Sequence, residues 1–169
     1  MLSISLTGIS GSAQPRFAQV IVDDVVLVDS TGSSPINNGA IWSKALKSQY
    51  TMSNPQNAFD GTTANKAADG DGTFNTTRTP PYTLEFTPAE PIPFSSRVRI
   101  YTGLNPGSPY NGKVFIDTGS GYGDGIAATQ NAFQVIASGS GMIHRIKATG
   151  DQNASEINAI EVDGTILVD

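Results

Sequence analysis

The sequence predicts an all-β fold, a sandwich or barrel of antiparallel strands. Short β-branched segments with a period of two recur along the chain, and clusters of Gly, Pro, Asn and Ser separate them. The chain has 18 Gly and 10 Pro among 169 residues, which is typical of a turn-rich protein. Short strands separated by Gly/Pro turns favour a sandwich or a barrel over a helical fold.

The closing segment of the chain occurs twice. Residues 17–29 read FAQVIVDDVVLVD, and residues 157–169 read INAIEVDGTILVD, 140 positions later and without a gap. A weaker match places residues 2–6 over residues 142–146. A chain that begins and ends with the same segment indicates a piece or a relic of an array, and such arrays build extended particles and binding surfaces.

Each copy of this segment predicts a β-hairpin. Asp163-Gly164 lies between β-branched runs and suits a type I′ turn, which needs positive φ at both central residues, and Asp23-Asp24 is the equivalent turn signal. An apolar two-stranded hairpin is not stable alone in water. We therefore expect the N-terminal arm to be covered by its own module or by a neighbouring subunit, through the assembly residues Val20, Val22, Val26 and Val28.

The remaining elements follow from alternation and turn signals. Strands are expected at residues 82–86, 97–101, 113–117, 133–137 and 142–147. Residues 41–46 and 55–59 predict single helical turns at most, since short isolated helices are marginal. We expect Trp42, the single tryptophan, to anchor the first of these turns in the core. The predicted organisation is an arm and linker over residues 1–36 and a β-sandwich module over residues 37–169.

Composition excludes several classes of protein. The net charge is −5, and the ten Lys and Arg residues are scattered, so we expect no nucleic-acid binding. The absence of Cys excludes disulfides, thiolate metal sites and cysteine nucleophiles. No apolar run reaches 18 residues and no secretory signal is recognisable, so we expect no membrane span.

Catalytic patterns are weak. His144 is the single histidine, and no Gly-x-Ser-x-Gly stretch joins a strand to a helix. Residues 69–73 (Asp-Gly-Asp-Gly-Thr) lack the later Glu of a calcium loop and predict an acidic turn. Glu85 and Glu161 alternate with apolar neighbours and are expected to face solvent. A glycosidase needs two carboxyl groups that face each other across a cleft, so the sequence favours a protein that is not an enzyme.

Four landmarks carry a family resemblance. They are Asn-Ala-Phe-Asp-Gly at residues 57–61, Phe-Thr-Pro at 86–88, the Ile-Ala-Ser-Gly-Ser-Gly turn at 136–141 and the closing segment from residue 157. In this order they resemble the discoidin-like, or coagulation-factor type C, galactose-binding-like modules, in the version found in structural proteins of tailed phages of marine cyanobacteria. The resemblance implies an antiparallel, jelly-roll-like β-sandwich, and a location in the virion after assembly in the host cytoplasm.

The resemblance also implies a candidate calcium site, because discoidin-like sugar binders often hold a calcium ion beside the Asp of Asp-Gly. Asp60 matches that position, but Asn65 stands at the Thr position, Ala67 at the Trp position and Ala159 at the Glu position. Calcium takes six to eight oxygen ligands, usually with more than one carboxylate. We expect no cofactor, with calcium at Asp60 as the alternative to a turn that Asp60 caps.

Two functions emerge from these observations. The first is a non-enzymatic phage virion structural protein, a capsid decoration or a surface appendage or fibre component, which would assemble through β-strand contacts with other virion proteins and with copies of itself. The alternative is a carbohydrate-binding adhesin module that recognises host surface glycans, with Tyr110 and Tyr122 as loop aromatics on which a sugar ring could stack. A polysaccharide hydrolase is a third class.

Overall fold

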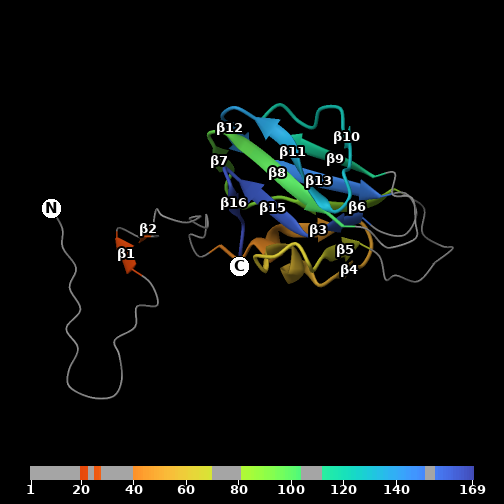
Figure 1. Ribbon diagram of the computed structural model, residues 1–169, viewed down its shortest axis with the longest axis horizontal. Helices are drawn as coiled ribbons and strands as arrows, with labels where there is room; N and C mark the ends of the chain where they lie inside the picture. The colour runs from red at the N-terminus through yellow and green to blue at the C-terminus, as the bar shows by residue number, and fades with distance from the viewer. Residues whose placement is uncertain (1–19, 23–24, 28–39, 70–80, 104–111, 151–154) are drawn as a thin grey trace, which may run out of the picture.

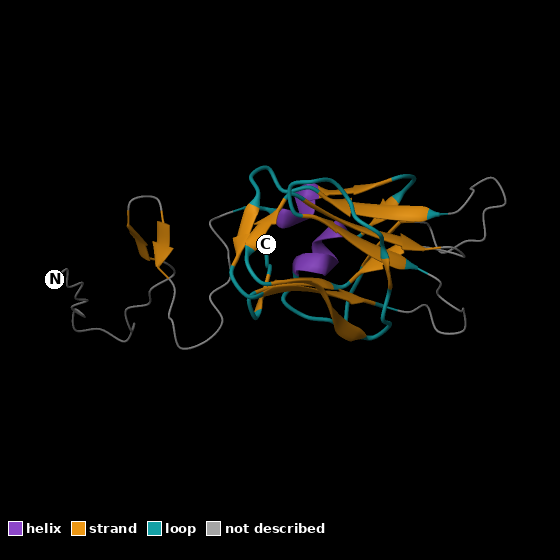
Figure 2. Cartoon of the chain, turned by 90° about the horizontal axis from the view of Figure 1, so that it is seen from above, coloured by secondary structure: helices purple, strands orange, loops and turns teal. Residues whose placement is uncertain are grey.

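The computed structural model describes residues 20–22, 25–27, 40–69, 81–103, 112–150 and 155–169. The fold is an antiparallel β-sandwich, as the sequence predicts (Figures 1 and 2). All strand pairs recorded for these residues are antiparallel, and Figure 2 shows the two layers of strands edge-on. No helix in the described residues is long and apolar enough to cross a membrane.

The first layer is a five-stranded sheet in the order β10-β9-β13-β6-β3. Its strands are β3 (Leu46–Ser48), β6 (Tyr82–Phe86), β9 (Lys113–Asp117), β10 (Ile126–Ala127) and β13 (Arg145–Gly150). Because side chains alternate along a strand, β6 buries Tyr82, Leu84 and Phe86 and directs its other residues outward. Leu84 pairs with Ala148 of β13, and both side chains are fully buried.

The second layer is a four-stranded sheet in the order β11-β8-β15-β16. It comprises β8 (Arg97–Thr102), β11 (Ala132–Ser138), β15 (Ala159–Val162) and β16 (Thr165–Ile166). Shorter pairings close the ends of the sandwich. They involve β4 (Met52–Ser53), β5 (Ala67–Asp69), β7 (Ile92–Phe94), β12 (Gly141–Ile143) and β14 (Ser155–Ile157).

One apolar core lies between the layers. Its largest fully buried side chains include Phe59, Phe86, Leu84, Ile100, Ile146 and Ile160. The 3₁₀ turns η1 (Trp42–Ala45) and η2 (Pro55–Phe59) contribute Trp42 and Phe59 to it, so the predictions of single turns and of a core tryptophan are confirmed. The Trp42 and Phe59 rings both lie against Phe86, with centroids 6.1 and 5.6 Å away.

Two sequence-based expectations are wrong in detail. The strand predicted over residues 142–147 is two strands, because the chain leaves its pairing with β7 and joins β9 and β6 at His144, whose N–H donates to the Asp117 carbonyl. Glu161 does not face solvent: it is 3% exposed, because Arg99 and Arg97 of β8 pair with its carboxylate. Alternation alone does not show that a polar position is covered by charged neighbours.

Both predicted hairpins form. In the C-terminal one Asp163 and Gly164 have φ of 50° and 90°, as a type I′ turn requires. The N-terminal hairpin consists of β1 (Val20–Val22) and β2 (Val25–Leu27), which pair with each other as a separate two-stranded sheet. Figure 1 draws this hairpin apart from the sandwich, and in the described residues β1 and β2 pair only with each other. Val20, Val22 and Val26 are therefore strand residues, and Val28 lies outside the described residues.

Candidate functional site

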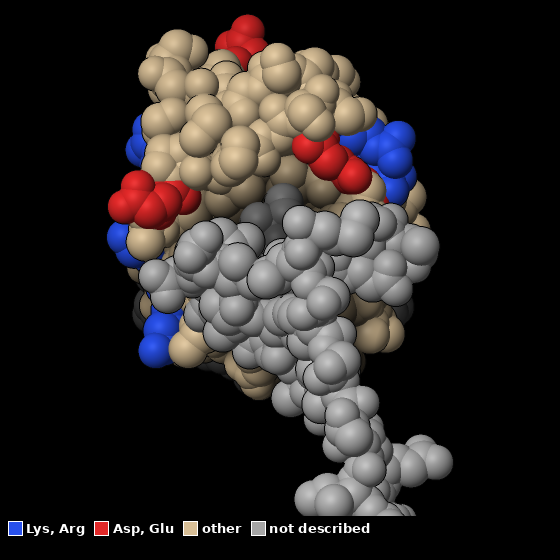
Figure 3. All heavy atoms as spheres, turned by 90° about the vertical axis from the view of Figure 1, so that its left-hand side faces the viewer, with Lys and Arg blue, Asp and Glu red and all other residues tan. Residues whose placement is uncertain are grey.

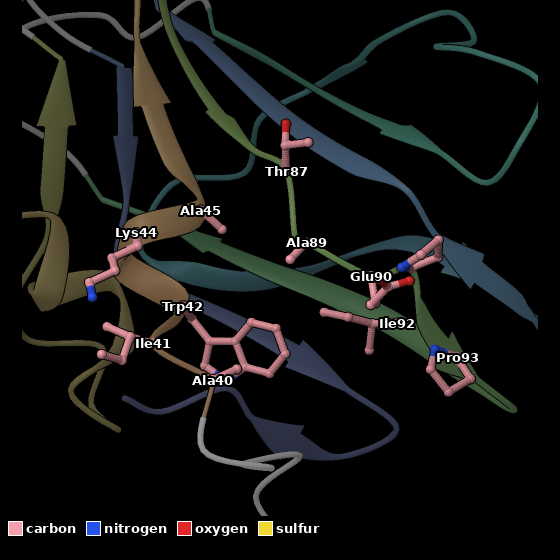
Figure 4. A pocket seen from close by; sticks show the side chains of 11 residues that line it. Ala40, Ile41, Trp42, Lys44, Ala45, Thr87, Ala89, Glu90, Ile92 and Pro93 are labelled. Carbon is pink, nitrogen blue, oxygen red and sulfur yellow. The ribbon is translucent and has the colours of Figure 1, made fainter.

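A pocket of about 570 Å³ opens at the end of the sandwich where the described module begins. It lies between η1 and the segment that links β6 to β7, and Figure 4 shows the side chains that line it. The lining residues are Ala40, Ile41, Trp42, Lys44, Ala45, Thr87, Ala89, Glu90, Pro91, Ile92 and Pro93. This volume lies within the usual range for small-ligand sites, which are mostly apolar with a few polar groups.

Trp42 forms the inner wall of this pocket, which we call the Trp42 pocket. In Figure 4 its indole lies between Ile41 on one side and Ile92 on the other. Trp42 is 6% exposed, yet its buried indole N–H has no hydrogen-bond acceptor within the described part of the chain. A buried donor without an acceptor costs about 1–3 kcal/mol.

The rim of the Trp42 pocket supplies the polar groups. Lys44 and Glu90 are exposed and carry opposite charges, and the half-buried Thr87 adds a hydroxyl. Ile41 is 50% exposed beside them and adds apolar surface to the rim. Figure 3 faces this end of the molecule; the described surface above the grey residues is mostly uncharged, with a few acidic groups on it and basic groups at its sides.

Sequence reasoning missed this pocket. Trp42 was expected only in the core, and the two lining segments, residues 40–45 and 87–93, are about 45 positions apart along the chain. No local signal in the sequence indicates it, because its two walls come together only in the fold.

Tyr122, a predicted glycan ligand, lies on the outer face of the five-stranded sheet. Its hydroxyl donates to Glu85 Oε2 at 2.9 Å, and its ring meets Phe115 edge-on with centroids 6.1 Å apart. The Lys147 ammonium lies 4.4 Å and the Arg145 guanidinium 4.7 Å from its ring centre. Burial and the bond to Glu85 raise the pKa of Tyr122 above its usual value. These contacts engage the hydroxyl and bring both cations to the ring, so they give Tyr122 a packing role.

Asp117 holds the loop that carries Tyr122. Its Oδ1 accepts hydrogen bonds from the N–H groups of Gly119 and Gly121, each at 2.9 Å, and its Oδ2 accepts two from Arg145. The bonds from Arg145 and Gly119 outweigh desolvation and lower the pKa of Asp117 to about 2. The charged form of Asp117 therefore orders both the loop and the guanidinium beside Tyr122.

This arrangement predicts acid sensitivity of the fold. A carboxyl group with a pKa of about 2 in the folded state stabilises the fold fully above its unfolded pKa, near 4, and loses that contribution as the pH falls toward 2. Melting temperatures measured by circular dichroism between pH 7 and pH 2 should fall below pH 4. Asp117→Asn should lower the melting temperature at pH 7 and reduce the further fall in melting temperature below pH 4. Asp124→Asn, an exposed acid in the same loop, should leave the profile unchanged; an Asp117→Asn profile parallel to that of the parent chain contradicts the assignment.

Asp60, the predicted metal ligand, caps the loop that follows it. Its Oδ1 accepts from the Thr62 N–H at 2.8 Å and from the Thr62 hydroxyl at 2.9 Å, and its Oδ2 accepts from the Asn65 amide at 2.7 Å. Burial opposes ionisation, but these hydrogen bonds prevail and keep the pKa of Asp60 below its usual value. Ala159 offers no side-chain ligand. This donor set fits a calcium ion poorly, because both Asp60 oxygens already accept hydrogen bonds from the chain.

A lysine fastens this same loop to the sandwich. The Lys66 ammonium forms an ion pair with the carboxylate of Glu156, whose side chain is 4% exposed. Two residues after Glu156, the Asn158 amide donates to the Thr63 carbonyl at 2.9 Å. The loop after η2 is therefore joined to β14 by an ion pair, and to the residue between β14 and β15 by a hydrogen bond.

Other predicted residues have simpler outcomes. Tyr110 and most of the acidic turn at residues 69–73 lie outside the described residues. In the described part of the chain no three His, Asp or Glu side chains gather as a metal site. His144 is half-buried, with its ring next to Gly119. The buried or half-buried carboxylates of Glu85, Asp117, Glu156 and Glu161 are each hydrogen-bonded or ion-paired within the chain.

A scan of protein-family models and a search of curated proteins found no match. Among solved structures the chain is similar to the family 32 carbohydrate-binding module from C. perfringens NanJ in complex with galactose, with 14% identity, a TM-score of 0.45, and coverage of 72% of this chain and 96% of that chain.

A pectin-binding carbohydrate-binding module has 12% identity and a TM-score of 0.45, and the match covers 74% of this chain and 93% of that one. The module CpGH89CBM32-6 of Clostridium perfringens has 16% identity and a TM-score of 0.44, and the match covers 70% of this chain and 92% of that one. These are similarities of chain path, and none of them assigns a ligand to this chain.

Proposed function

We propose that this protein is a non-catalytic carbohydrate-binding module whose ligand site is the Trp42 pocket. The observation that carries the proposal is a mostly apolar pocket of about 570 Å³, with the Trp42 indole in its wall and Lys44, Thr87 and Glu90 in its lining. A sugar ring has apolar C–H faces and a rim of hydroxyl groups. Such a ligand can bury its C–H faces against the apolar wall while its hydroxyl groups meet the polar residues of the lining.

The rim groups fit the remaining hydroxyls. Lys44 donates, Glu90 accepts, and Thr87 can do both, so the pocket offers both kinds of partner around an apolar centre. The pocket lining contains a single carboxylate, Glu90. Since hydrolysis of a glycosidic bond uses two carboxyl groups roughly 5–10 Å apart, this composition suits binding rather than cleavage.

The test is a glycan array with the full chain, followed by calorimetric titration of the best ligand. Ala89 is an exposed residue of the pocket lining, so Ala89→Trp should fill the mouth without disturbing the core, and affinity should fall at least about tenfold. Ala127→Trp, at an exposed position in β10, is the matched control and should bind like the parent chain. Absence of saturable binding refutes the function; binding that survives Ala89→Trp and is lost in Tyr122→Ala refutes this site.

A second function is favoured by one observation. The hairpin β1–β2 carries the sequence of the closing hairpin and pairs in the same way, which suits a structural component of a phage particle that assembles through strand contacts. Both functions are compatible, because a virion protein can also recognise a glycan. Cryo-electron microscopy of a particle that contains this chain would reveal its position there.

A further inference from the structure

We propose that the N-terminal hairpin β1–β2 is a second closing hairpin, which binds the edge of β8 in the place that β15–β16 holds. We call this place the hairpin slot: the edge of β8 that pairs with β15, together with the turn at residues 95–97 and the chain at Ser43 and Phe59. The proposal concerns assembly and is independent of the Trp42 pocket.

The turn of the closing hairpin is held by one carboxylate. Asp163 accepts four hydrogen bonds, from the N–H groups of Ser95, Ser96 and Arg97 and from the Ser95 hydroxyl, at 2.7–2.9 Å. Desolvation opposes its charge, but the backbone hydrogen bonds prevail and lower the pKa of Asp163. An aspartate at this turn position therefore supplies the hydrogen bonds that hold the hairpin turn in the slot.

The strands of the closing hairpin supply apolar contacts and a terminal anchor. Ile160 and Val162 lie opposite Ile100 and Val98 of β8, and Leu167 is fully buried after β16. At the end of the chain, Asp169 Oδ1 accepts from the Ser43 N–H at 3.0 Å, and the Asp169 N–H donates to the Phe59 carbonyl at 3.0 Å.

The N-terminal hairpin repeats this pattern position by position. Val22 pairs with Val25 and Ile21 with Val26, just as Val162 pairs with Thr165 and Glu161 with Ile166. The 140-residue offset that aligns the sequences therefore also aligns the pairing register. Asp23, Leu27 and Asp29 stand at the positions of Asp163, Leu167 and Asp169. The main difference is Ile21 at the position of Glu161, which makes the N-terminal copy more apolar.

The connection permits this docking. A hairpin in the slot would place residue 29 where Asp169 lies, beside Ser43, and ten residues (30–39) would then lead to Ala40. Ten residues span up to roughly 35 Å, so the linker can reach the slot of its own sandwich or that of a second copy. Each chain has two such hairpins and one slot, so the N-terminal hairpin enters a slot only by displacing a β15–β16 hairpin, in its own sandwich or in a second copy.

Disulfide trapping tests this in the full chain, which has no cysteine of its own. Val162 lies opposite Val98, so an arm in the slot places Val22 opposite Val98. Val22→Cys with Val98→Cys should therefore cross-link. Val162→Cys with Val98→Cys reports the resident hairpin. Val22→Cys with Lys47→Cys, an exposed site on the other sheet, measures random collision of the arm.

Weakening the β15–β16 hairpin should increase the fraction of slots that the N-terminal hairpin occupies. In an Asp163→Ala background the yield of the 22–98 cross-link should rise roughly five- to tenfold, since a tenfold change in a ratio corresponds to about 1.4 kcal/mol. Adding Asp23→Ala should reverse this rise. A cross-link within one chain or between two chains supports the proposal, and the size of the product shows whose slot is filled. A 22–98 yield no greater than the 22–47 yield in both backgrounds overturns it.

Discussion

Replacing Lys66 by methionine should lower the free energy of unfolding by about 2–4 kcal/mol, because it leaves a buried carboxylate without its counter-charge. Glu156 is the carboxylate: its side chain is 4% exposed, Lys66 pairs with one oxygen, and the other has no partner in the described residues. Removing one member of a fully buried pair costs about 3–5 kcal/mol. Lys66 is 36% exposed, so water can partly replace it, and we expect a smaller loss than for a fully buried pair.

Urea unfolding followed by fluorescence or circular dichroism measures this loss. Lys113→Met, at an exposed position of β9, is the control and should change stability by less than about 0.5 kcal/mol. In the Lys66→Met background, Glu156→Gln should recover part of the lost free energy of unfolding, because it removes the carboxylate charge that Lys66 no longer balances. A Lys66→Met variant as stable as Lys113→Met would show that the ion pair does not fasten the loop.

Leu167→Ala should destabilise the protein by about 2–4 kcal/mol, because it leaves a cavity beneath the closing hairpin. Leu167 has no exposed surface and belongs to the central core. The duplication offers a matched control, since Leu27 stands at the same position of the N-terminal copy. While β15–β16 holds the slot, Leu27→Ala should leave the unfolding of the sandwich unchanged.

The pair of leucine variants separates the two hairpins in one measurement. Hydrogen exchange or urea unfolding should show a large effect for Leu167→Ala and almost none for Leu27→Ala. Equal effects would mean that both hairpins are part of one cooperative core. An effect of Leu27→Ala alone would mean that the N-terminal copy is the resident occupant of the slot.

Much of the fold could be predicted from local signals. Residues 82–86 alternate strictly, and the strand found there has the same bounds. Asp163-Gly164 predicted a tight turn, and both residues have positive φ. The short strands β5 and β7 were missed, because three-residue segments such as Ala67–Asp69 and Ile92–Phe94 have too few positions to show a period.

The candidate site was harder to predict than the fold. Tyr122 was chosen because it lies in a Gly-rich loop, but Glu85, Arg145 and Lys147 reach it from two other strands. The Trp42 pocket was missed, because its two walls meet only when η1 packs beside the segment before β7.

The sequence by itself determined the period of the strands, the turn at Asp163-Gly164 and the duplication of the closing hairpin, since each depends on residues that are neighbours along the chain. Only the tertiary structure decided that Glu161 is buried against Arg99, that Lys66 reaches Glu156 and that Trp42 lines a pocket. Each of these contacts joins residues more than 40 positions apart. Their burial and charge pairing depend on how the two sheets pack, which no local pattern encodes.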